Sequence, residues 1–176
     1  QQRRAMQEKL GVATGPADSA LFPVADDPDV QRAALEALAR PIDRLLAELF
    51  WFWPLDGDDA ARDALADGAL EGARGAWEAA LESEPAVARH NLAVLHHALA
   101  LEAGSARRTD AERNDAGPAL EHAALALEHW SAVVDDEDFW HGLRERALAM
   151  DDRRLTTGFV RQVRRTLPTA LLAIHA

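Results

Sequence analysis

The chain of 176 residues contains no cysteine and no tyrosine, and Lys9 is its single lysine. Without cysteine, a disulfide framework, a thiolate zinc site and a cysteine nucleophile are all excluded. No apolar run approaches the roughly 20 residues that a membrane-spanning helix needs. The net charge of -11 disfavours binding to nucleic acid or to an anionic membrane. We therefore expect a cytoplasmic protein that binds neither nucleic acid nor a membrane.

The sequence also lacks the common signatures of catalysis. It contains no glycine-rich phosphate loop, no Gly-x-Ser-x-Gly elbow and no metal motif of a protease or deaminase. A nucleophile that meets a histidine in space remains open, although the sequence holds only four serines. We predict no catalytic residue, no metal ligand and no cofactor, and we expect that the protein is not an enzyme.

Alanine dominates what is present, with 38 of the 176 residues, whereas valine and isoleucine are sparse. Alanine is the strongest helix former, so this composition predicts an all-α protein. The chain begins without methionine and stops inside an apolar run, which suggests a piece of a longer polypeptide.

Breaks in the helical pattern divide the chain into roughly seven to nine helices. Pro41 is expected to kink or split a helix that starts near Asp29 and ends in the aromatic run 50–53. Residues 104–118 are polar and bounded by glycine and proline, so we expect a long surface loop there. Pro168 is expected to open the last helix.

We divide the chain into two units. The first, 1–54, contains an N-terminal helix end, a linker and the aromatic-ended helix, and the second, 55–176, is the repeat region. Further helices are expected at about 60–68, 70–83, 87–103, 119–134, 137–149 and 156–166.

One pattern of small and large residues occurs twice. Ala73, Trp77 and Ala80 are followed by Pro85, and Ala126, Trp130 and Val133 repeat the first three positions. This pattern resembles the second helix of a tetratricopeptide repeat, in which the small residue admits the partner helix and the aromatic ring fills the next turn. The resemblance covers about residues 60–150 and implies antiparallel helical hairpins stacked as an irregular repeat. A plain helical bundle with tryptophans in its core is the alternative.

A second resemblance concerns residues 1–54. A basic helix end, a proline-rich linker and the sequence Glu-Leu-Phe-Trp-Phe-Trp-Pro are similar to the region after a J-like module in bacterial chaperone-associated repeat proteins. The His-Pro-Asp signature of a working J domain is absent from the chain. The resemblance therefore implies an association with chaperone or assembly work, and not stimulation of Hsp70.

Four consecutive aromatic residues, Phe50, Trp51, Phe52 and Trp53, are the most unusual local feature. On a helix they would be about 100° apart and would cover most of its circumference. Two interpretations follow: the helix end is packed between two layers, or some rings form an exposed patch that anchors a partner.

Histidines form two pairs at i, i+7, His90 with His97 and His122 with His129. Each pair lies on one helical face, and four imidazoles meeting between two helices could bind a transition metal. The members of one pair are about 10 Å apart, too far to share one ion unless a facing helix brings its own pair. We expect surface or hydrogen-bonded histidines instead.

Acidic runs occur at 56–59, 135–138 and 151–152, each at an expected helix start, where carboxylates cap free amides. A basic segment, residues 153–165, carries five arginines and no acidic residue. It is expected to dock on the acidic body of the same chain or to recruit an acidic peptide or a phosphate group.

Together these features favour a non-enzymatic helical-repeat domain that binds a protein or peptide in a groove between hairpins. The candidate contact residues are the aromatic anchors Trp51 and Trp53 and the polar residues Arg89, His90 and Asn91. A structural or self-associating domain of a larger protein is the second hypothesis, and a histidine-based metal protein is the third.

Overall fold

The computed structural model of the chain describes residues 27–56, 60–109 and 117–175. Within these ranges all regular structure is helical, which confirms the all-α prediction. The expected helix end at 1–10, the linker before residue 27, and Gly57, Asp58 and Asp59 of the first acidic run lie outside the described residues. The helices are α2 (Pro28–Ala37), α3 (Pro41–Leu49), α4 (Ala60–Ala66), α5 (Leu70–Ala80), α6 (Pro85–Thr109), α7 (Gly117–Asp135), α8 (Glu137–Ala149) and α9 (Thr157–His175).

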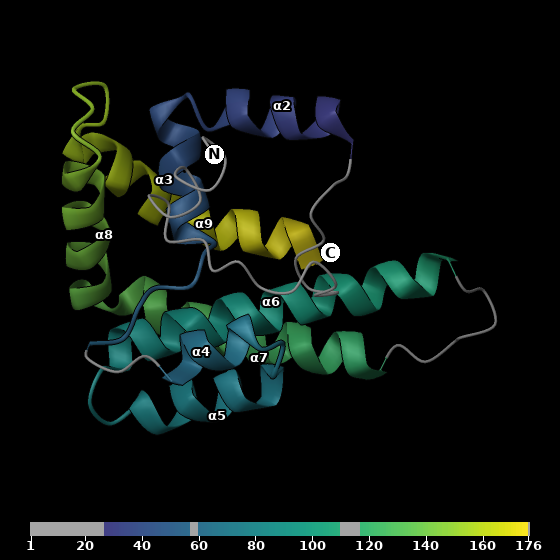
Figure 1. The fold of residues 1–176 in the computed structure, drawn as a ribbon. Coiled ribbons are helices and arrows are strands. Elements are labelled where there is room, and N and C mark those ends of the chain that lie inside the picture. The colour runs from purple at the N-terminus through teal and green to yellow at the C-terminus, as the bar shows by residue number, and fades with distance from the viewer. Residues whose placement is uncertain (1–26, 57–59, 110–116, 176) are drawn as a thin grey trace.

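The two longest neighbouring helices, α6 and α7, lie side by side and form the centre of the fold (Figure 1). The pair α4 and α5 packs on one side of them, and α3, α8 and α9 lie on the other. α2 runs along an outer edge beyond α3 (Figure 1). α6 contacts α5 on one side and α8 on the other, so it joins the two groups of helices.

Local sequence explains several of the helix boundaries. Pro41 splits the first expected helix in two, because it occupies the first turn of α3, where its missing N–H is not needed. Pro85 begins α6 in the same way. Between α4 and α5, Gly68 has a φ of +73°, and the amide of Ala69 donates to the carbonyl of Ala64. This left-handed glycine ends α4 and turns the chain into α5.

Two helix boundaries predicted in the second half of the chain are wrong. Residues 104–109 belong to α6 and 117–118 to α7, whereas 110–116 lie outside the described residues. A single glycine, Gly104, costs a helix only about 1 kcal/mol and does not end α6. Pro168 lies inside α9 instead of opening a helix. The buried stripe of Val160, Val163, Leu167 and Leu171 continues past it, and burial of these side chains offsets the lost hydrogen bond.

The buried side chains form two clusters, and the aromatic run joins them. The larger cluster contains Leu45, Leu49, Trp53 and Trp130 together with residues of α8 and α9. The smaller one surrounds Trp77, between α4, α5 and α6. Phe52 packs against both clusters. Residues of the expected unit 1–54 thus share a core with residues of the region 55–176, and the boundary between the two units stays a prediction.

Candidate functional site

Asn91 of α6 fixes the backbone of Trp53 through both atoms of its side-chain amide. The Trp53 amide N–H donates to Asn91 Oδ1 at 2.8 Å, and Asn91 Nδ2 donates to the Trp53 carbonyl, also at 2.8 Å. Asn91 is fully buried, so water cannot replace either bond. The amide therefore substitutes for the backbone partner that Trp53 lacks after the end of α3.

His90, the neighbour of Asn91, binds the last residue of α3. Its Nε2 lies 2.8 Å from the Leu49 carbonyl oxygen, and because a carbonyl only accepts, Nε2 carries the proton. Burial lowers the pKa of His90 to about 4, and the positive charge of Arg146 acts in the same direction, whereas the hydrogen bond to Leu49 acts against both. His90 is thus a neutral, structural histidine at pH 7.

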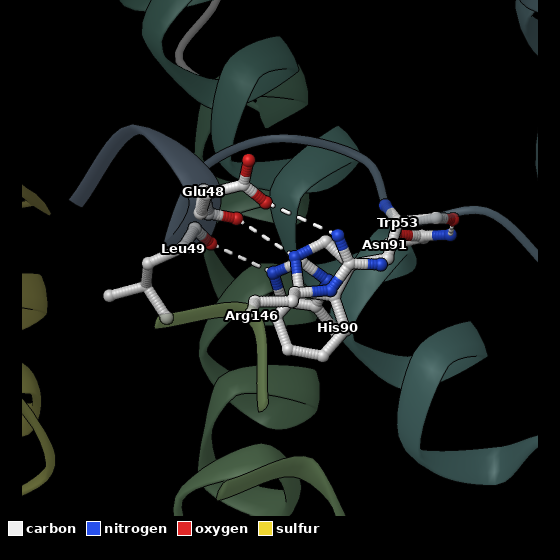
Figure 2. A network of polar contacts seen from close by, with 6 residues as sticks. All are labelled: Glu48, Leu49, Trp53, His90, Asn91 and Arg146. Carbon is white, nitrogen blue, oxygen red and sulfur yellow. Dashed lines mark hydrogen bonds and ion pairs between the residues drawn. The ribbon is translucent and has the colours of Figure 1, made fainter. Parts of the chain in front are cut away.

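The indole of Trp53 completes this polar network, which consists of Glu48, Leu49, Trp53, His90, Asn91 and Arg146 (Figure 2). The indole N–H donates to the Glu48 carbonyl at 2.8 Å. Arg146 of α8 lies 4.3 Å from the centre of the same indole and donates to the Glu48 carboxylate at 3.2 Å. The network therefore ties α3, α6 and α8 together around one aromatic side chain.

The four aromatic rings point to different neighbours, and they do not lie on a helix. α3 ends at Leu49, so the expectation of a helical run at 50–53 is wrong. Phe50 packs edge-on to Trp130, Phe52 stacks on Trp77 with centres 4.7 Å apart, and Trp53 stacks on Phe139 at 4.8 Å. The packing favours the interpretation that the segment is held between two layers. Trp51 is half-buried and contacts Phe52.

The structure separates the five residues for which a partner contact was predicted. Trp53, His90 and Asn91 lie in the interior, with at most 4% of their surfaces exposed, and they hold the chain together. Trp51 is half-buried beside them. Arg89, in contrast, lines a groove at the surface. Among the five, Arg89 is therefore the side chain best placed to meet a partner directly.

Gly142 of α8 provides a test of how tightly the indole of Trp53 is held. A Cβ atom at Gly142 would lie 3.3 Å from Trp53 Cζ3, whereas a Cβ at Gly75 of α5 would meet nothing within 4 Å. The fixed indole cannot yield, so we expect Gly142→Ala to lower the free energy of unfolding by about 1 kcal/mol. Gly75→Ala should raise it by about 0.5–1 kcal/mol. Urea denaturation of both variants measures the difference, and stabilisation by both would show that Trp53 is free to move.

The groove that contains Arg89 has a volume of about 620 Å³ and lies where α5, α6 and α7 meet. Its carboxylates come from Glu128, Asp135 and Asp136, so negative charges outnumber the single guanidinium. Asp136 also begins α8, because its Oδ1 accepts hydrogen bonds from the amides of Asp138 and Phe139. The capping role predicted for this acidic run is thereby confirmed. Leu81, His129 and Ala132 complete the lining.

The third acidic run behaves differently from the prediction. Asp152 was expected to cap the helix that follows, but α9 begins only at Thr157. Asp152 Oδ1 instead accepts bonds from the amide and the guanidinium of Arg154, each at 3.0 Å. This carboxylate closes a turn between α8 and α9, and it does not cap a helix.

Hydrogen-bonded histidines were expected, and His90 is one, through its bond to Leu49. His97 packs on Phe50, and another residue of α6, His96, pairs with His122 and His129 of α7. The Nδ1 of His96 lies 3.1 Å from Nδ1 of His122, and its ring stacks on that of His129. In the described part of the chain, no group of three or more histidine or acidic side chains has the arrangement of a metal site.

Arginines of α9 divide between internal contacts and exposure. Arg164 lies 2.7 Å from the carboxylate of Glu137 and 5.5 Å from the ring centre of Trp140, both in α8. Arg161 and Arg165 are exposed. The basic helix is thus attached to the body of the chain mainly through its apolar stripe, with one ion pair beside it.

The contacts of Glu48, Arg146 and His96 were not predicted from the sequence. Each of these residues acts through a residue on another helix, which the local sequence does not show. The 98-residue separation between Glu48 and Arg146 illustrates why spacing along one helix could not reveal the contact.

Comparison with protein-family models, curated proteins and solved structures gave no match to this chain. Among the described helices, none combines the length and the hydropathy that crossing a membrane requires.

Proposed function

We propose that this chain is a non-enzymatic, irregular tetratricopeptide-like domain that binds an extended segment of a protein partner in the groove formed by α5, α6 and α7. The observation that carries the proposal is the groove itself, with its volume of about 620 Å³ and its mixed charged lining. We place the protein in the cytoplasm, in keeping with a chain that lacks cysteine. An association with chaperone or assembly work is part of the same proposal.

The burial of the repeated sequence pattern supports the repeat assignment. Ala73 of α5 and Ala126 of α7 are both fully buried, and Trp77 and Trp130 are each 1% exposed. Equivalent positions in the two helices thus have equivalent environments. The contacts α4·α5 and α6·α7 join successive helices, which supports antiparallel hairpins within the region of the resemblance.

The charges of the groove suggest which kind of segment it would hold. Glu128 and Asp135 lie on α7 seven residues apart, so they share one helical face and offer two anionic positions along it. Arg89 lies on the neighbouring helix and can donate hydrogen bonds to a backbone carbonyl. The partner is therefore an extended segment with at least one lysine or arginine, whose backbone lies along Arg89.

Selection from a random peptide library on the purified protein tests this proposal. We expect enriched peptides to carry basic residues, and the double variant Glu128→Gln, Asp135→Asn to bind them about tenfold more weakly, since it removes both charges without changing shape. The matched control is Asp67→Asn, Glu145→Gln, which removes the same charge from exposed positions on α4's end and on α8.

The comparison between the two double variants decides the outcome. If both lose affinity equally, the overall negative field attracts the peptides and the groove has no special role. If neither loses affinity, or if no peptide is enriched, this assignment of the groove is wrong. Circular dichroism of each variant shows that its helices remain folded.

A further inference from the structure

Three imidazoles form a stack across the interface of α6 and α7. His96 of α6 lies between His122 and His129 of α7, with ring centres 5.3 Å and 5.9 Å away. The planes of His96 and His129 are within 3° of parallel. Because His122 and His129 are two helical turns apart, a gap separates them on α7, and the ring of His96 fills it. We name these three side chains the histidine stack.

Only one proton can lie between the Nδ1 atoms of His96 and His122. Their Nδ1 atoms are 3.1 Å apart, so one must donate a hydrogen bond and the other must accept it. When both rings are charged, each Nδ1 carries a proton, and two N–H groups then face each other at hydrogen-bond distance. Full protonation therefore replaces an attraction between α6 and α7 by a repulsion.

The charged groups around the stack, three carboxylates and two guanidiniums, leave one net negative charge to offset as many as three added protons. From α5, Glu71, Arg74 and Glu78 face it, and Arg74 forms ion pairs with both of these glutamates. Arg89 of α6 and Glu128 of α7 are the other charged groups that influence it. His96 is 4% exposed, so water cannot solvate its charged form fully.

The direction of the pKa values agrees with this geometry. Burial lowers the pKa of His96 to about 4, and the neighbouring His122 and His129 act in the same direction. Burial also lowers the pKa of His129. His96 and His129 are consequently neutral near pH 7, and His96 takes up its proton only under acid conditions.

We propose that the histidine stack is a pH-sensitive switch, in which full protonation separates α7 from α6 and thereby alters the groove that His129 lines. The effect on the groove rests on the function proposed above, whereas the separation of the helices does not. Because Glu128, His129 and Asp135 all belong to α7, a movement of this helix displaces much of the groove lining. The partner segment is then released as the pH falls toward 4–5.

Amide hydrogen exchange at pH 7.0 and pH 4.5, corrected for intrinsic rates, tests the switch without any ligand. Amides of residues 122–132 in α7 should lose about tenfold more protection on acidification than those of residues 160–171 in α9. The variant His96→Phe keeps a stacking ring that cannot take up a proton, and it should abolish this difference. The control His141→Phe replaces an exposed histidine of α8 and should preserve it.

An NMR titration of the imidazoles in the unmodified protein provides a readout that does not depend on how the variant folds. At least one histidine of the stack should titrate well below the others, along a curve that reflects coupled protons. Three independent titrations near pH 6.5, or equal loss of protection in α7 and α9, would overturn the switch. If α7 opens as expected but no peptide depends on Glu128 and Asp135, the switch stands and the proposed function fails.

Discussion

Replacement of Asn91 by leucine is expected to lower the free energy of unfolding by about 3–5 kcal/mol. The variant removes the partners of two buried backbone groups, the amide and the carbonyl of Trp53. Each buried polar group without a partner costs about 1–3 kcal/mol, and leucine branches at Cγ with the same number of side-chain heavy atoms as asparagine, so the replacement leaves no cavity. Urea denaturation monitored by tryptophan fluorescence measures the loss.

The matched control is Gln162→Leu, which removes an exposed side-chain amide from α9. It should change the free energy of unfolding by less than about 0.5 kcal/mol. A similarly small effect of Asn91→Leu would mean that the two bonds to Trp53 do not hold the aromatic segment, and that the interior role assigned to Asn91 is wrong.

Acidification is expected to destabilise the protein through His90. Its folded-state pKa of about 4 lies below the ordinary value of 6.5, so the unfolded chain takes up this proton first as the pH falls. The stabilisation that the neutral form of His90 contributes is complete above pH 6.5, and it is lost progressively as the pH falls toward 4. Over this window the loss from His90 alone is about 3 kcal/mol. The lowered pKa values of His96 and His129 add to it in the same direction.

The variant His90→Gln isolates the contribution of His90 to the loss of stability on acidification. Glutamine can donate a hydrogen bond to the Leu49 carbonyl but cannot take up a proton. We expect a lower stability at pH 7 and a shallower decline between pH 6.5 and 4.5. The exposed His141→Gln should leave the decline unchanged. Parallel declines for His90→Gln and the unmodified protein would show that His90 does not titrate with a lowered pKa.

Helix content could be predicted from the sequence because the helix propensity of alanine and the helical spacing of leucine are both visible in short stretches of sequence. The twofold pattern around Trp77 and Trp130 likewise identified residues that are buried. The prediction failed where a tertiary contact decides the local structure. The aromatic run leaves the helix since Asn91, 38 residues away, takes over the backbone bonds of Trp53.

The candidate site was predictable only in part for the same reason. Arg89, His90 and Asn91 were identified together as polar residues of an inner helix, yet successive residues on a helix point in directions about 100° apart. His90 and Asn91 consequently face the core, and Arg89 faces the groove. The histidine stack needed the register of α6 against α7, which fixes His96 opposite the gap between His122 and His129.

The most direct test of the central claim is an NMR map of the binding surface. A basic peptide from the selection is added to the isotopically labelled protein, and the shift of each backbone amide is followed. We expect the largest changes at Leu81, at Arg89 and along residues 128–136, with little change along α9. Changes confined to α9 or to the segment 50–53, with the groove amides unmoved, would contradict the account.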